Sequence, residues 1–116
     1  MSERDTLYLL PPGFIDQGRR EFCPECAEIW GLLAYYPALR ESVDIVYEPI
    51  AHPRPALVAR LGEGEWNCPT LILAPSSPQF ENAPAEIANG LALFGSAQSI
   101  GRYYAERFGT AFPRGS

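Results

Sequence analysis

The sequence lacks an excess of positive charge, since nine lysine and arginine residues stand against fourteen aspartate and glutamate residues, giving a net charge of −5. Nucleic acids and anionic membrane surfaces select clustered positive charge, so this balance argues against both as partners. No apolar run approaches the roughly 20 residues of a membrane-spanning helix. The run Leu7-Tyr8-Leu9-Leu10 is too short for the core of a signal peptide, and we therefore expect a cytoplasmic location.

Cysteine and histidine are also scarce, with three copies and one copy respectively. Three cysteines cannot all pair, and a reducing compartment disfavours structural disulfides. The chain has no internal repeat and no linker, and its 116 residues suffice for one hydrophobic core. These features predict a single domain over residues 1–116 and leave the oligomeric state open.

The most informative stretch is Phe22-Cys23-Pro24-Glu25-Cys26, which opens a segment with helical periodicity. Downstream apolar residues recur at i, i+3, i+4 and i+7, the spacing of one helix face. Pro24 suits the first helical position, because its missing N–H is not needed there. The spacing therefore places Cys23 at the N-terminus of a helix. The apolar face comprises Ile29, Leu32, Leu33 and Tyr36.

A helix N-terminus presents unpaired N–H groups and a partial positive charge, which together favour a thiolate over a thiol. The thiolate is the nucleophilic form of cysteine, so we expect Cys23 to be the reactive thiol. The carboxylates of Glu25 and Glu28 compensate the partial positive charge at the helix N-terminus. The Glu25 charge also opposes a second negative charge on the nearby Cys23 sulfur. We expect Cys26, one turn further on, to be less exposed and to act as the resolving thiol.

The remaining pattern predicts the element order β-α-β-α-β-β-α, an α/β fold with a central four-stranded mixed sheet flanked by helices. Residues 11–22 form a long connection before the first helix, and Asn89-Gly90 is a strong hairpin signal. Ser96 is a candidate N-cap for the last helix. The predicted strands are Thr6–Leu10, Val43–Tyr47, Thr70–Leu73 and Leu91–Phe94, and the predicted helices are Pro24–Tyr36, Leu57–Leu61 and Ser96–Gly109.

This combination resembles the thioredoxin-fold superfamily over roughly residues 6–109. Cys23-Pro24-Glu25-Cys26 is similar to the glutaredoxin signature, and Pro69-Thr70-Leu71 resembles the cis-proline segment that faces the active-site cysteines. The ending of the chain, residues 99–109, resembles the close of a glutathione-transferase N-terminal domain. The whole also resembles a small, uncharacterised bacterial family of thioredoxin-like proteins. The resemblance implies a small thiol–disulfide oxidoreductase in which Cys23 attacks and Cys26 resolves.

The same resemblance implies a substrate-binding surface around the thiols for a protein or small-molecule disulfide. It predicts a cis peptide bond at Pro69, which would expose the backbone of Cys68 to the bound partner. Arg19, Arg20 and Arg54 are candidates to bind a substrate carboxylate. The implied substrate-binding residues are Phe22, Pro24, Cys68, Pro69, Thr70, Arg19 and Arg20.

We expect no tightly bound cofactor. Glutathione-binding relatives use an acidic residue and a serine before the last helix, where this chain has Ser96 and Ala97, so glutathione stays an open candidate without its usual anchoring charge.

Several alternatives stay open at this point. Cys68 is either a third redox thiol or a small buried residue, the commonest state of free cysteine. The three cysteines and His52 also make four ligands of the type that binds zinc, although Cys-x-x-Cys is only half a zinc signature. We predict no metal site, and the alternative function is a non-catalytic interaction or metal-binding module that retains the cysteines.

Overall fold

The computed structural model describes residues 4–116, which fold around a five-stranded mixed sheet with strand order β4-β1-β5-β7-β6. Strands β1 and β4 are parallel, whereas β5 is antiparallel to both of its neighbours and β6 is antiparallel to β7. Strand β1 therefore lies inside the sheet, and its residues Leu7 and Leu9 are fully buried. The strands are β1 (Asp5–Leu9), β4 (Val43–Tyr47), β5 (Thr70–Ile72), β6 (Glu86–Ala88) and β7 (Leu91–Phe94).

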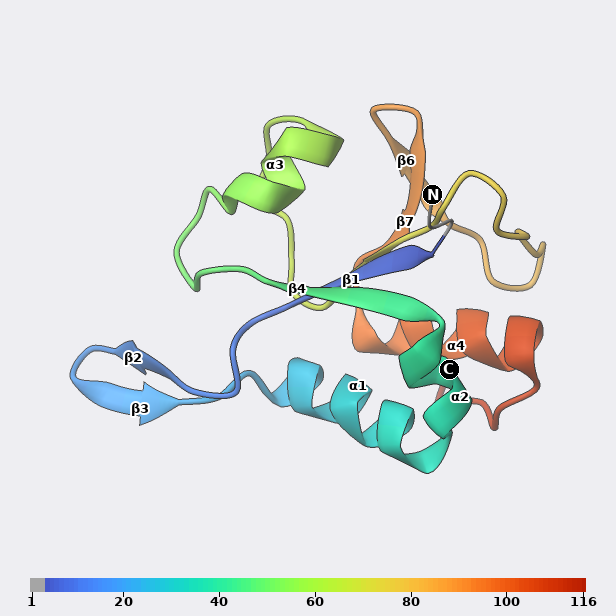
Figure 1. Ribbon diagram of the computed structural model, residues 1–116, viewed down its shortest axis with the longest axis horizontal. Coiled ribbons are helices and arrows are strands. Elements are labelled where there is room, and N and C mark those ends of the chain that lie inside the picture. Colours follow the sequence, from blue (N-terminus) through green and yellow to red (C-terminus); the bar gives the residue numbers. More distant parts are fainter. Residues whose placement is uncertain (1–3) are drawn as a thin grey trace.

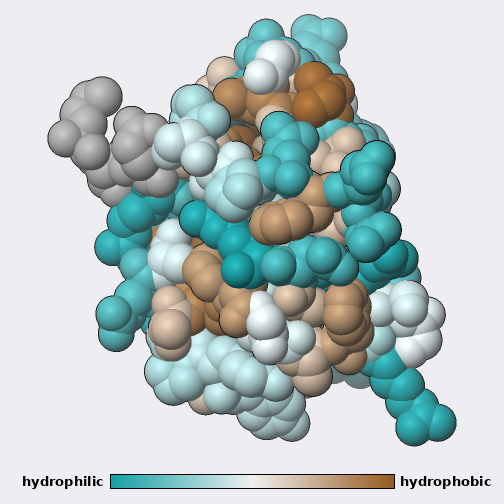
Figure 2. Space-filling view, turned by 90° about the vertical axis from the view of Figure 1, so that its right-hand side faces the viewer, coloured by the Kyte–Doolittle hydropathy of each residue, from teal (hydrophilic) through white to brown (hydrophobic). Residues whose placement is uncertain are grey.

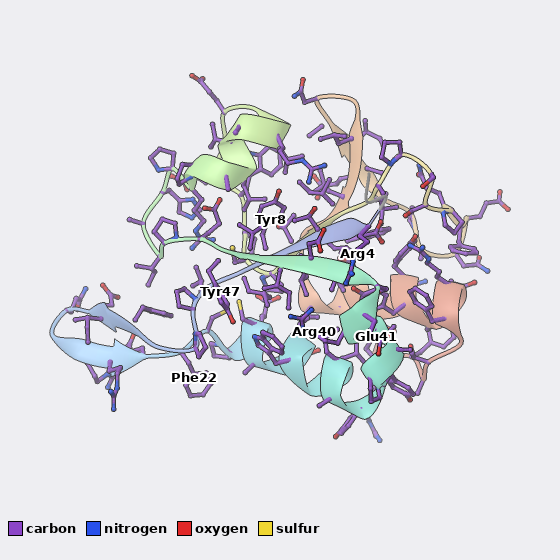
Figure 3. The ribbon with its side chains drawn as sticks, in the orientation of Figure 1. Arg4, Tyr8, Phe22, Arg40, Glu41 and Tyr47 are labelled. Carbon is purple, nitrogen blue, oxygen red and sulfur yellow. The ribbon has the colours of Figure 1, made fainter. Side chains whose placement is uncertain are left out.

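Helices cover both faces of this sheet (Figure 1). Helices α1 (Pro24–Tyr35), α2 (Pro37–Glu41) and α4 (Ala97–Phe108) lie on one face, and α3 (Pro55–Leu61) lies on the other. Tyr8 points to the α3 side, where its hydroxyl accepts a hydrogen bond from Arg60 (Figure 3). Within residues 4–116, no helix is long and apolar enough to cross a membrane.

The structure contains every strand and helix of the predicted order β-α-β-α-β-β-α. It adds three short strands and one short helix. The prediction of four strands is wrong, because β6 pairs with β7 across the Asn89-Gly90 turn and forms a fifth strand at the sheet edge. Both turn residues have positive φ, as a tight hairpin turn requires. The hairpin signal pointed to this partner strand, but Glu86–Ala88 is too short to show an alternating pattern.

The long connection between β1 and α1 is also more ordered than the sequence indicates. It folds into a hairpin of β2 (Phe14–Asp16) and β3 (Arg19–Glu21), joined by a turn at Gln17 and Gly18. This hairpin projects from the body next to the start of α1 (Figure 1). Helix α1 ends at Tyr35, before Pro37, and Pro37 itself begins the short helix α2, because proline fits the first position of a helix.

The surface opposite this hairpin is mixed in character. Figure 2 shows hydrophobic residues there as separate brown areas with hydrophilic ones between them. The hairpin and the adjoining Cys-x-x-Cys segment are on the side of the molecule that faces away from this view (Figure 1).

Candidate functional site

The thiol of Cys23 caps the N-terminus of helix α1, as the sequence analysis predicts. Its backbone is extended, its Sγ accepts a hydrogen bond from the Cys26 N–H at 3.1 Å, and Pro24 occupies the first turn. A sulfur in this position receives a backbone donor and lies at the positive end of the helix dipole, two features that stabilise a negative charge on it. The three cysteines are free of disulfide bonds.

The thiol of Cys26 lies beneath Cys23 and is only 3% exposed. Its Sγ accepts a hydrogen bond from the Leu10 N–H at 3.4 Å. Burial raises the pKa of Cys26 to about 12; the neighbouring Cys23 thiol adds to the increase, and the Leu10 N–H opposes it. Cys26 is therefore a neutral thiol at pH 7, while the partly exposed Cys23 is the sulfur that solvent reaches.

The segment before strand β5 faces the first cysteine. The Cys68–Pro69 peptide bond is cis, which confirms that prediction, and the Cys23 thiol donates to the Cys68 carbonyl oxygen at 3.7 Å. The Cys68 side chain is 4% exposed, in line with the expectation of a small buried residue. Burial raises the pKa of Cys68 to about 11, an increase that the nearby Arg54 guanidinium reduces.

Two of the predicted substrate-contacting side chains are buried and serve the fold. Arg54 is 6% exposed and donates to the carbonyl oxygens of Pro49, Ile50 and Trp66, so its guanidinium already has three partners within the fold, and binding of a substrate carboxylate stays a prediction. Thr70 is fully buried, and its hydroxyl donates to the Asn67 carbonyl oxygen at 2.5 Å. The Thr70 hydroxyl is therefore engaged within the fold, and substrate binding at Thr70 stays a prediction.

The arginine pair Arg19-Arg20 lies on strand β3 of the projecting hairpin. The Arg19 guanidinium donates twice to one carboxylate oxygen of Glu21, at 2.9 and 2.6 Å, and is directed to this partner. Arg20 is exposed on the same strand. Phe22 follows the hairpin and is 62% exposed, and Figure 3 shows its ring projecting from the start of α1. Phe22 and Pro24 thus lie next to the thiols, whereas the two arginines lie on the hairpin.

The carboxylate of Glu25 makes a contact that sequence reasoning missed. Its Oε1 accepts a hydrogen bond from the Ala97 N–H at 3.1 Å, at the first residue of helix α4. Ser96 caps the same helix, as predicted, and shares a reciprocal capping box with Ser99. The motif that carries the cysteines therefore supplies a negative charge to a second helix N-terminus. Only the acidic character of Glu25 was visible in the sequence.

Glu48 is a second acidic residue that the sequence analysis did not single out. It is 3% exposed, and its carboxylate accepts hydrogen bonds from the Ala56 and Leu57 N–H groups at the start of α3. Its charge also contributes to the raised pKa of Cys68. Its position directly after strand β4 and before a proline-rich turn was the available signal.

The described residues 4–116 contain no group of three or more histidine, cysteine, aspartate or glutamate side chains placed to hold a metal ion. His52 is exposed in the turn before α3, next to a second cis peptide bond at Pro53 that was not predicted. It lines a different surface hollow from the one that contains Cys23 and Cys26. The four-ligand zinc alternative is therefore wrong in its geometry.

Comparison with known families gives one match. Residues 4–112 match the family described as "Protein of unknown function (DUF3088)". The chain belongs to the DUF3088 family. No curated protein and no solved structure matches the chain. The family description assigns no activity.

Proposed function

We propose that this DUF3088 protein is a thiol–disulfide oxidoreductase with a thioredoxin-like fold. The observation that carries the proposal is the asymmetry of the two thiols: Cys23 caps a helix and is reached by solvent, and Cys26 is buried and neutral. The fold proposal is supported by the strands β4-β1-β5-β7, which match the implied four-stranded mixed sheet, with β6 as an additional edge strand.

The first step is attack by the Cys23 thiolate on one sulfur of a substrate disulfide. A bond forms between the Cys23 Sγ and that sulfur, the substrate S–S bond breaks, and the departing thiolate takes a proton from water. The Cys26 N–H and the dipole of α1 stabilise the attacking sulfur in its charged form. The product of this step is a mixed disulfide on Cys23.

The second step uses Cys26 as the resolving thiol. Cys26 gives its proton to water and its sulfur attacks the Cys23 Sγ. The bond between Cys23 and the substrate sulfur breaks, and the second substrate thiolate leaves and takes a proton from water. The substrate has then gained two electrons, and the protein holds a Cys23–Cys26 disulfide. Because burial keeps Cys26 protonated, only one negative sulfur is present before the substrate arrives. A thiol reductant returns the pair to the dithiol.

The substrate contacts in this proposal come from Phe22, Pro24 and the backbone around Cys68 and Pro69, which border the Cys23 sulfur. The substrate class is a protein or small-molecule disulfide, and the reaction needs no tightly bound cofactor. Cytoplasmic location, which would keep the pair reduced, is part of the same proposal.

Mass spectrometry of thiols across a series of glutathione redox buffers tests the proposal. We expect one two-electron transition between dithiol and disulfide for Cys23 and Cys26 within roughly −180 to −320 mV, with Cys68 unchanged. Cys26→Ser should also accumulate a mixed disulfide on Cys23 when it is mixed with a disulfide. If no transition occurs in this window and no adduct accumulates, the alternative of a non-catalytic interaction module replaces the enzyme proposal.

A further inference from the structure

A small apolar cavity opens beside the two thiols. Its volume is about 190 Å³, and all its lining side chains are hydrocarbon, aromatic or sulfur. Both cysteine sulfurs belong to residues of its wall, so a molecule in this cavity lies next to the proposed nucleophile. The other walls come from the end of β1, the connection to β2 and helix α1. The principal lining residues are Pro11, Pro12, Phe22, Cys23, Cys26 and Trp30.

The walls of this cavity are largely fixed before anything binds. Proline rings lock φ in the backbone of Pro11 and Pro12. Trp30 packs against the hydrophobic core on one side, and the Arg40 guanidinium lies 5.9 Å from the centre of its ring. Phe22 differs, because 62% of it is exposed and its ring would lose contact with water against an apolar ligand. An apolar group bound in the cavity would therefore remove the most apolar surface from water.

The acidic residues in the first turns of α1 disfavour an anionic ligand at this end of the helix. Glu25 and Glu28 both lie in the first turns of α1, and the Glu25 carboxylate already holds the Ala97 N–H of helix α4. The Arg19 guanidinium is directed to Glu21. An incoming carboxylate would therefore meet the like charges of Glu25 and Glu28. It would also find the N-terminus of α4 already occupied by the Glu25 carboxylate.

From these features we infer that the substrate is a small, uncharged disulfide that carries a ring-sized apolar group, and that this group occupies the cavity beside Cys23. The inference rests on the proposed function and names its substrate class. Glu25 and the cavity together select such compounds over anionic disulfides such as oxidised glutathione.

The seated group decides which sulfur is attacked. Cys23 forms its bond with the sulfur that bears the apolar group, the S–S bond breaks, and the other half leaves as a thiolate that takes a proton from water. Cys26 then gives its proton to water and attacks the Cys23 Sγ. The mixed disulfide breaks, the apolar half leaves as a thiolate that takes a proton from water, and the Cys23–Cys26 disulfide remains. The reduced protein supplies both electrons, so no other reductant is required for one turnover.

The test uses pre-reduced full-length protein and three probes under single-turnover conditions. The probes are benzyl 2-hydroxyethyl disulfide, bis(2-hydroxyethyl) disulfide and oxidised glutathione. We expect the benzyl compound to react about tenfold faster than its symmetric hydroxyethyl analogue, because the ring buries apolar surface. With Cys26→Ser, the trapped adduct on Cys23 should carry the benzyl half, whereas trapping mainly of the hydroxyethyl half would overturn the inference.

Two variants examine the parts separately. Phe22→Ser, at an exposed position, should lower the benzyl-to-hydroxyethyl rate ratio by roughly threefold to tenfold. Glu25→Gln keeps an oxygen for the Ala97 N–H and removes the charge, so it should raise the rate with oxidised glutathione by roughly threefold to tenfold. Glu28→Gln is the matched control, since it removes an equal charge from the same helix without the contact to α4, and it should change this rate less.

The outcomes separate this inference from the proposed function. If reduced protein reacts with none of the three disulfides, the oxidoreductase proposal fails. If it reacts with all three at similar rates, and neither Phe22→Ser nor Glu25→Gln changes the ratios, the oxidoreductase proposal stands and the substrate class is wrong.

Discussion

Helices α1 and α4 begin close together, yet their N-termini are closed by different atoms. Helix α4 has an oxygen cap, in which Ser96 Oγ accepts from the Ser99 N–H at 3.1 Å, and the Glu25 carboxylate accepts from Ala97. Helix α1 has a sulfur cap, in which Cys23 Sγ accepts from Cys26 N–H at the same distance. Serine is a common N-cap, whereas cysteine is not among the preferred ones. Under the proposed function, the sulfur cap stabilises helix α1 less than an oxygen cap would and supplies a reactive thiol instead.

The largest expected effect comes from giving α1 the cap that α4 has. Cys23→Ser keeps a side-chain acceptor for the Cys26 N–H but cannot form a disulfide, so disulfide reduction should be lost completely. The free energy of unfolding should stay the same or rise by up to about 1 kcal/mol, because serine caps helices well. Single-turnover kinetics and urea denaturation measure the two effects. Residual reduction by this variant would mean that another thiol is the nucleophile.

The sequence shows this contrast only in part. Cys23 and Ser96 were predictable as helix starts, because each precedes a periodic apolar run. Pro24 marks the first start, and the capping serine itself marks the second. The pairing of Glu25 with Ala97, 72 residues away, was not predictable, because it depends on how α1 packs against α4. A local pattern indicates where a helix begins, and tertiary packing determines what lies opposite its first turn.

The same limit applies to residues at the site. Arg54 and Thr70 stand near the thiols in the expected order of elements, but their roles depend on burial, which a polar residue in a turn does not reveal. The hairpin of residues 14–21 was missed because its strands have three residues each, below the length at which alternation is visible. The strands β1, β4, β5 and β7 were predictable, because each coincides with an apolar or alternating run.

A second prediction asks whether a helix end, and not sulfur alone, makes a thiol reactive. Cys68 caps no helix, and burial raises its pKa from 9.0 to about 11. Above pH 9 the unfolded state loses this proton while the folded state keeps it, so stability falls as pH rises. Between pH 8 and 10 the loss from this thiol should be about 1 kcal/mol.

Cys68→Ala provides the measurement, through urea denaturation at pH 8 and pH 10 in the presence of a phosphine reductant. Between pH 8 and pH 10, the free energy of unfolding should fall less in the variant than in the wild-type protein, and the difference between the two falls should equal that amount. The cost of the smaller side chain is the same at both pH values and does not affect this difference. The buried tyrosines, Tyr103 and Tyr104, contribute equally to both proteins and cancel in the difference. Cys26 cancels except for the smallest cause of its raised pKa, which is the charge of Cys68 itself. Equal losses in the two proteins would show that Cys68 ionises as freely in the folded state as in the unfolded chain.

The smallest expected effect concerns the oxygen cap itself. Ser96→Ala removes the acceptor for the Ser99 N–H and should lower the free energy of unfolding by about 1 kcal/mol. Ser96→Asn, which keeps a capping acceptor, should recover most of this loss and serves as the matched control. Because the Ala97 N–H still has Glu25 as its partner, reduction of an uncharged disulfide should change less than stability does. A larger effect on that rate than on unfolding would mean that the cap of α4 also positions the Cys23 sulfur, and the two helix ends would then have to be treated as one site.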